Sequence, residues 1–209
     1  MEKRIKEKNF PRAAAVIILI NCICFILAEF VGSTTVPDTL IRCGALYSPL
    51  VNDGQYWRFI TSMFMHSGVQ HLINNMLTLY VLSDIFEREL GTVKYIVVYL
   101  LGGIAGNVIE FVLDMRTEGF SFCVGASGAV FAVLGGLIAV LIINRGHVRG
   151  MTLKRILIMA ALSVYSGFAS PDIAVAAHLG GMASGFLMAL LLYRKKRKDT
   201  DREKDPAEG

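Results

Sequence analysis

Six apolar stretches, most of them near twenty residues long, limit what this chain can fold into. They cover about residues 12–32, 69–86, 93–113, 127–143, 153–169 and 173–193. A helix of roughly 20 residues crosses a hydrocarbon core about 30 Å thick. Hydrophobic residues fill 54% of the 209 positions, whereas soluble domains average about 45–50% even with glycine counted. The sequence therefore predicts an all-α, polytopic membrane protein built as a bundle of six transmembrane helices.

The predicted helices form one membrane domain over residues 12–193. A basic segment, 1–11, precedes this domain, and a charged tail, 194–209, follows it. The tail is rich in lysine, arginine, aspartate and glutamate, so we expect it to be disordered, with its basic part touching anionic lipid.

Basic residues are distributed unevenly between the two sides of the predicted bundle. With the N-terminus inside, the outer segments hold only three of the 21 lysine and arginine residues, namely Arg42, Arg58 and Arg116. The positive-inside rule then places both termini in the cytoplasm. This asymmetry also explains the net charge of +4, so the charge does not indicate a nucleic-acid partner. We expect a multi-pass protein of a bacterial cell membrane.

The cysteines and histidines do not form a disulfide framework or a metal-binding motif. Cys22 and Cys24 lie two residues apart in the first stretch and point in different directions. Cys43 and Cys123 both fall on the outer side, where they could pair, although their spacing does not require it. The chain has no CxxC or HExxH motif and only four scattered histidines, so we expect no metal and no cofactor.

A serine between glycines begins the fourth apolar stretch, in the sequence Gly125-Ala126-Ser127-Gly128. As a helix this stretch is about 25 Å long, so Ser127 is expected to lie below the outer surface of the membrane. The free N–H groups and the dipole of a helix N-terminus favour developing negative charge there. Ser127 is therefore a candidate nucleophile. The alternative is that these small residues only pack against another helix.

A histidine in the sixth stretch lies at a similar depth. His178 comes about 8 Å along a helix that enters from the same side, and an ionisable residue inside a membrane span is functional by default. Gly181 and Gly185 follow on the same face and allow two helix backbones to approach closely. His178 is thus a candidate general base that takes the Ser127 proton. A histidine that only bonds a neighbouring helix is the alternative.

Two hydrogen-bond donors, His71 and Asn75, lie four residues apart near the outer start of the second stretch and share a helix face. Catalysis at a carbonyl requires donors arranged in advance for the oxyanion, so both residues are candidates for that role. Hydrogen bonding between helices is the alternative. His66 precedes this helix and is expected to order water or the loop. Asn107 and Glu110, inside the third stretch, have no role that the sequence assigns.

The segment 33–68 connects the first two stretches and is too long for a tight turn. It contains the run Gln55-Tyr56-Trp57-Arg58-Phe59. Tyrosine and tryptophan favour the membrane interface, so we expect part of this outer segment to lie among lipid headgroups.

Taken together, these motifs resemble those of the rhomboid family of intramembrane serine proteases. The resemblance covers about residues 12–193 and rests on several motifs in the expected order. They are the first-loop motif Tyr56-Trp57-Arg58, the positions of His66, His71 and Asn75, the cytoplasmic turn Glu87-Arg88-Glu89-Leu90-Gly91, the GxSG motif at 125–128, and the AHxxGxxxG motif at 177–185. One departure is Phe131, where family members often have tyrosine.

The resemblance implies a six-helix rhomboid-like bundle in which Ser127 is the nucleophile and His178 the base. It implies that the Ser127 backbone N–H, His71 and Asn75 form the oxyanion hole. The positions that it implies as supporting are Gly125, Gly128, Phe131, Gly181, Gly185, His66, Trp57 and Arg58. A ring at Phe131 could still stack on His178, without the tyrosine hydrogen bond. The implied partners are the lipid bilayer and membrane-anchored protein substrates, cleaved near their outer ends without metal or ATP.

Two other functions stay open at this point. A rhomboid-like protein without activity would bind or escort membrane proteins, but such proteins usually lack the serine or the histidine. A proton-coupled transporter would use Glu110, His71 and His178. It predicts interrupted helices in two matching halves, and the sequence shows no such halves. Labelling of Ser127 by a fluorophosphonate distinguishes a protease from a transporter.

Overall fold

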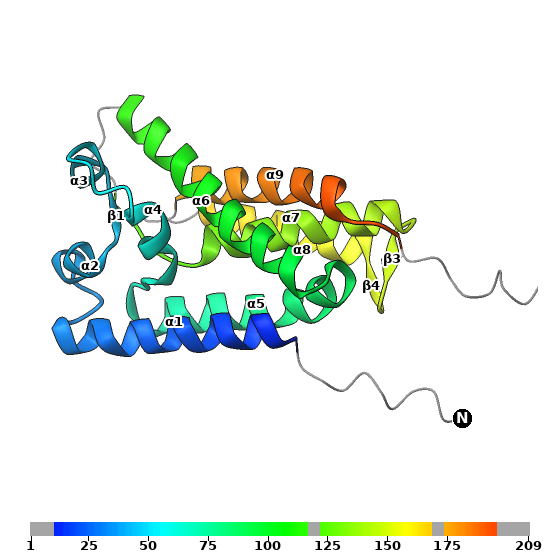
Figure 1. Cartoon of the computed structure of the whole chain (residues 1–209), viewed down its shortest axis with the longest axis horizontal. Helices are drawn as coiled ribbons and strands as arrows, with labels where there is room; N and C mark the ends of the chain where they lie inside the picture. The colour runs from blue at the N-terminus through cyan, green and yellow to red at the C-terminus, as the bar shows by residue number, and fades with distance from the viewer. Residues whose placement is uncertain (1–10, 117–121, 169–173, 196–209) are drawn as a thin grey trace, which may run out of the picture.

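The structure, a computed structural model, describes residues 11–116, 122–168 and 174–195. It is mostly helical, as predicted, and six long helices form a bundle (Figure 1). They are α1 (Arg12–Val31), α5 (Gly68–Leu90), α6 (Thr92–Arg116), α7 (Ser127–Ile143), α8 (Leu153–Phe168) and α9 (Val175–Leu192). Each lies on one of the six predicted apolar stretches. The predicted basic segment 1–11 and nearly all of the tail 194–209 lie outside the described residues.

Three helices, α1, α6 and α9, are long and apolar enough to cross a membrane, and α7 is a shorter apolar helix. Large apolar side chains cover the outward surface of the bundle, among them Leu27 and Phe30 on α1 and Leu191 on α9. Exposed leucines suit a surface that faces lipid tails, because the tails are as apolar as leucine. These features are those of an integral membrane protein.

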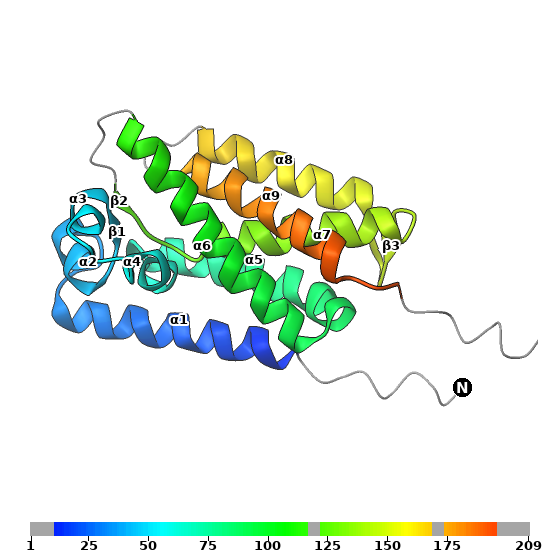
Figure 2. The same cartoon turned by 45° about the horizontal axis from the view of Figure 1, so that its top comes forward.

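Helix α7 lies inside the bundle, where it packs against α5, α6, α8 and α9. Most of its side chains are buried, and Figure 2 shows α8 and α9 running alongside it. A Cβ at Gly181 of α9 would overlap the backbone carbonyl of Gly128, and a Cβ at Gly185 would overlap that of Ala132. Glycine at these two positions therefore lets the backbones of α7 and α9 touch.

The outer segment 33–68 folds into short elements rather than one extended connection (Figure 1). They are α2 (Pro37–Cys43), β1 (Leu46–Tyr47), α3 (Ser48–Asn52), α4 (Arg58–Thr61) and the 3-10 helix η1 (Ser62–Phe64). Strand β1 pairs antiparallel with β2 (Phe122–Cys123), with Leu46 opposite Cys123. This pairing ties the outer segment to the residues just before α7. Its place among lipid headgroups stays a prediction.

Arg58 is buried within the outer segment and bonds several parts of it. It is only 6% exposed, and its guanidinium donates to the carbonyls of Ile41 at 2.9 Å and Ala45 at 2.7 Å, and to Gln55 Oε1 at 2.9 Å. Burial lowers the pKa of Arg58, but arginine stays protonated in proteins, so these are hydrogen bonds of a buried cation. Trp57, by contrast, is exposed. Trp57 and Arg58, neighbours in the predicted motif, therefore face in different directions.

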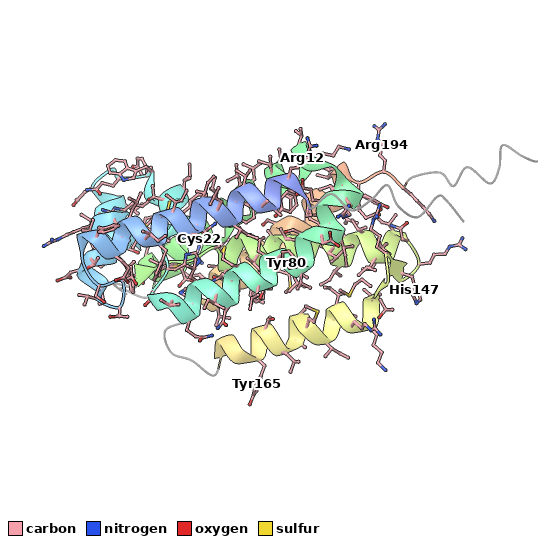
Figure 3. All side chains as sticks on the ribbon, turned by 90° about the horizontal axis from the view of Figure 1, so that it is seen from below. Arg12, Cys22, Tyr80, His147, Tyr165 and Arg194 are labelled. Atoms are coloured by element: carbon pink, nitrogen blue, oxygen red, sulfur yellow. The ribbon has the colours of Figure 1, made fainter. Side chains whose placement is uncertain are left out.

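Polar contacts join distant segments at the opposite end of the bundle. Lys94 Nζ donates to the carbonyl of Leu192 at 2.8 Å, which links the start of α6 to the end of α9. Arg149 pairs with Glu89 at 2.6 Å, which links α5 to the hairpin that precedes α8. The hairpin consists of β3 (His147–Val148) and β4 (Met151–Thr152). Figure 3 shows three labelled residues toward this end, Arg12, His147 and Arg194.

Candidate active site

A sharp backbone turn brings Ser127 to the first position of α7. Gly125 has a φ of +119°, a conformation that other residues rarely adopt, and its N–H donates to the carbonyl of Ser62 at 3.0 Å. A Cβ at Gly125 would also lie 2.8 Å from atoms of the His71 ring. Both the backbone conformation and the neighbouring side chain therefore require glycine at this position.

Helices α7 and α9 bring a serine and a histidine into contact. His178 Nε2 lies 2.8 Å from Ser127 Oγ, a hydrogen-bond distance. His178 belongs to the first turn of α9, where its N–H donates to the carbonyl of Ala174 at 3.2 Å, and it is only 8% exposed. Within the described ranges, His178 Nδ1 has no hydrogen-bond partner. The two side chains thus form a hydrogen-bonded pair to which the described residues add no third member.

An aromatic ring supports one face of the His178 imidazole. Phe131 lies about one turn after Ser127 on α7. Its ring stacks on His178 with centroids 4.3 Å apart and an angle of 10° between the planes. Stacking of this kind restricts the orientation of the imidazole. Phenylalanine therefore provides the stacking contact without the hydroxyl that tyrosine would add.

Two side chains of α5 face the turn that precedes Ser127. The His71 ring lies against Gly125, and Asn75 Nδ2 lies 3.7 Å from the position that a Cβ on Gly125 would occupy. Asn75 Nδ2 also donates to the carbonyl of His71 at 3.1 Å. Both side chains therefore lie beside the backbone that leads to the serine, where they can donate to an oxygen bound there.

His66 touches the same loop from a buried position. Its ring is fully buried and packs edge-on against His71, with centroids 5.2 Å apart. The N–H of Ala126 donates to His66 Nε2 at 3.4 Å. His66 therefore contacts the backbone just before Ser127, and its role in ordering the loop stays a prediction.

The other predicted supporting residues fall into two groups. Gly128, Gly181 and Gly185 lie where the backbones of α7 and α9 touch, close to the serine–histidine pair. Trp57 and Arg58 are not brought to that pair. Arg58 bonds within the outer segment, and Trp57 is exposed.

Two polar residues of α6 connect to the site in a way that the sequence does not predict. Asn107 Nδ2 donates to Ser62 Oγ at 2.9 Å, and the Ser62 carbonyl holds the turn before α7. Glu110 Oε2 accepts the N–H of Ala177, in the first turn of α9, at 3.0 Å. One feature of the sequence could have indicated a shared role. The two polar residues are three positions apart inside an apolar stretch, which places both on one helix face.

The cysteines and the acidic residues make no further site in the parts of the chain that the structure describes. All four cysteines lie in those parts and are free thiols, so Cys43 and Cys123 are not bonded to each other. No group of three or more His, Cys, Asp or Glu side chains is arranged there to hold a metal ion.

Comparison with known proteins places the chain in a family. A family model for the rhomboid domain matches residues 53–195. Rhomboid protease GluP of Bacillus subtilis (strain 168) is 30% identical over 191 residues, which are 91% of this chain and 37% of that protein. Rhomboid-like protease 3 of Toxoplasma gondii is 31% identical over 203 residues, with 91% of this chain and 74% of that protein covered.

A plant protein is similar over a shorter range. RHOMBOID-like protein 5 of Arabidopsis thaliana is 33% identical over 156 residues, which are 74% of this chain and 50% of that protein. The chain thus spans 37% of the length of GluP and half that of the plant protein. The rhomboid-domain model nevertheless matches most of the chain, so this chain belongs to the rhomboid family.

Proposed function

We propose that this chain is an intramembrane serine endopeptidase that hydrolyses peptide bonds in or near the transmembrane segments of membrane-anchored proteins. The observation that supports the proposal most directly is the 2.8 Å contact between Ser127 Oγ and His178 Nε2. Two of the relatives are named a rhomboid protease and a rhomboid-like protease. A hydroxyl and an imidazole at this distance are the nucleophile and base that acyl transfer requires.

In the proposed mechanism, His178 Nε2 takes the proton of the Ser127 hydroxyl while Oγ attacks the carbonyl carbon of the scissile peptide bond. The protonated imidazole then gives this proton to the leaving amine, the C–N bond breaks, and an acyl-enzyme ester remains on Ser127. A water molecule, deprotonated by His178, attacks the ester. The ester C–O bond then breaks, the protonated His178 returns its proton to Ser127 Oγ, and the new carboxyl end of the substrate leaves.

The proposed oxyanion donors surround the turn at Gly125. They are the backbone N–H of Ser127 and the side chains of His71 and Asn75. The N-terminus of α7 adds its dipole at the same place. Because these groups are held by α5 and α7 before substrate binds, they can stabilise the negative charge without reorganising.

Replacing Asn75 with alanine is expected to lower kcat by roughly 10²–10³-fold, the effect of losing one oxyanion donor. Turnover of a model transmembrane substrate by the purified variant measures this. Asn74→Ala is the matched control, because Asn74 is the adjacent, exposed asparagine of the same helix. Equal kcat values for the two variants would remove Asn75 from the oxyanion site.

The proposal includes six membrane spans and one catalytic domain over residues 12–193, with both termini in the cytoplasm. The end of the bundle with Arg12, His147 and Arg194 (Figure 3) would face the cytoplasm, because basic residues accumulate on that side of membrane proteins. Ser127 and His178 both lie near the N-terminal ends of their helices, α7 and α9. These ends are at the other side of the bundle from Arg12, His147 and Arg194. Substrates would therefore be cleaved near their outer ends, in the bacterial cell membrane that we expect for this chain.

Labelling with a fluorophosphonate probe tests the proposal. The probe bonds covalently to a serine hydroxyl that a neighbouring base activates, so we expect adduct formation at Ser127, identified by peptide mass spectrometry. A transporter or a non-catalytic binder of membrane proteins would carry no adduct there. Absence of the adduct from purified, folded protein would therefore overturn the proposal.

A further inference from the structure

One face of α6 carries three polar side chains, Asn107, Glu110 and Asp114, in a helix that is otherwise largely apolar. Each of the three bonds a different segment near the candidate site. Asn107 bonds η1, Glu110 bonds α9, and Asp114 accepts from Ser48 at the start of α3. A polar side chain inside a membrane protein is costly unless it is bonded, so each contact favours one arrangement of its partner.

The hydrogen bond to Glu110 satisfies a donor at the start of α9. The N-cap residue of this helix is Ala174, whose methyl side chain cannot accept a hydrogen bond. The first N–H groups of a helix lack partners within the helix, and His178 N–H bonds back to Ala174. Glu110 Oε2 takes the N–H one residue earlier, that of Ala177, at 3.0 Å. Glu110 thus caps α9 from another helix, at the end where the dipole favours a carboxylate.

Backbone contacts hold Ala177 from its other side. It is only 2% exposed. A Cβ at Gly106 of α6 would lie 2.5 Å from the Ala177 carbonyl oxygen, and a Cβ at Gly128 of α7 would lie 3.6 Å from it. The carbonyl of Ala177 therefore rests on α6 and α7 while Glu110 holds its N–H. These contacts together set the position of the histidine that follows.

The Phe131 ring and the Ser127 hydroxyl contact the His178 imidazole, but no carboxylate of the described residues bonds it. In serine proteases with three catalytic residues, a carboxylate bonds histidine Nδ1, but His178 Nδ1 has no partner among the described residues. We infer that Glu110 is a positioning residue. It fixes the first turn of α9 through the backbone and so keeps His178 Nε2 within hydrogen-bond distance of Ser127 Oγ. The inference rests on the proposed function of that pair.

The rate constant of Ser127 labelling by a fluorophosphonate tests this role without requiring protein substrate. Glu110→Ala removes the acceptor and Glu110→Asp shortens it by one methylene, so each is expected to lower the rate constant about 10- to 100-fold, the effect of a misplacement near 1 Å. Glu110→Gln keeps an acceptor oxygen at the same reach and is expected to stay within about threefold of the wild type.

The labelled fraction separates positioning from folding. Loss of folded protein lowers the fraction of molecules that react but leaves the rate constant of the folded molecules unchanged. Asp114→Ala is the matched control, since it removes a carboxyl group from the same face of α6, one that accepts a hydrogen bond from Ser48 at the start of α3. Its rate constant is expected to equal that of the wild type.

Two results would overturn the inference. One is a Glu110→Asp protein that labels completely and does so with the same rate constant as the wild type. The other is a loss in Glu110→Gln as large as that in Glu110→Ala. If Glu110→Ala does not fold, the comparison of Glu110→Asp with Glu110→Gln decides the matter. Failure of the wild type itself to react would instead refute the proposed function, so the two failures are distinguishable.

Discussion

Ser127→Ala is expected to lower cleavage of a model transmembrane substrate by roughly 10⁴–10⁶-fold, as loss of a nucleophile does in serine proteases. The substitution removes the oxygen that lies 2.8 Å from His178 Nε2 and leaves the helix contacts in place. Cleavage products from protein reconstituted in liposomes, followed by gel mobility and mass spectrometry, measure the effect. Ser184→Ala is the control, because Ser184 bonds only within α9, to the carbonyl of Gly181, in the structure described.

His178→Ala should have a similar effect, since the nucleophile and its base act as a unit. The double variant should therefore be no slower than either single variant, because losses within one catalytic unit are not additive. Thermal unfolding of both single variants should stay close to that of the wild type. Substantial turnover by folded Ser127→Ala protein would refute the assignment of the nucleophile.

Gly181→Val is expected to produce the largest loss of stability. A Cβ at this position would overlap the backbone carbonyl of Gly128, and backbone cannot move aside as a flexible side chain can. Overpacking of a close contact costs about 1–3 kcal/mol, occasionally more, and here it would push α9 away from α7. The serine and the histidine would separate with their helices, so activity should fall together with the unfolding temperature.

Ala183→Val provides the comparison for this variant. Ala183 lies two residues further along α9 on an exposed face, so valine there adds apolar volume without meeting another backbone. Its unfolding temperature in detergent and its turnover should match those of the wild type. A Gly181→Val protein as stable and active as Ala183→Val would contradict close backbone packing at Gly181.

The helices were predictable from the sequence because apolar run length is a direct consequence of membrane thickness. Helix α5 shows the limit of that criterion, since it continues to Leu90, beyond the predicted end at residue 86. Its last turns are polar but bonded. Arg88 pairs with Asp84 at 2.9 Å, and Glu87 accepts the N–H groups of two residues at the start of α1. Apolarity alone cannot reveal a helical turn whose polar side chains have tertiary partners.

The candidate site was predictable to the extent that its residues are unusual for their surroundings. Ser127 and His178 are polar residues in apolar stretches and are flanked by small ones, so their sequence context marks them. Their roles remain predictions. The partner of Glu110 was not predictable, because it is a backbone N–H 67 residues away and every residue except proline has one.

The short elements of the outer segment could not be predicted from the sequence either. Strands β1 and β2 have two residues each, too few to show an alternating pattern. Arg58 gives no sign in the sequence that it is buried, because arginine is mostly exposed in proteins. Its burial depends on the carbonyls of Ile41 and Ala45, which become available only when α2 ends and the chain turns back.

The enclosure of α7 by its neighbours has a consequence for synthesis. Ser127 leaves the ribosome about fifty residues before His178 does, and the two side chains meet only after α9 has inserted and packed. A nascent chain interrupted before α9 would carry an alcohol with no partner to activate it. On the proposed mechanism, the enzyme is therefore inert towards other membrane proteins until its own translation has passed α9.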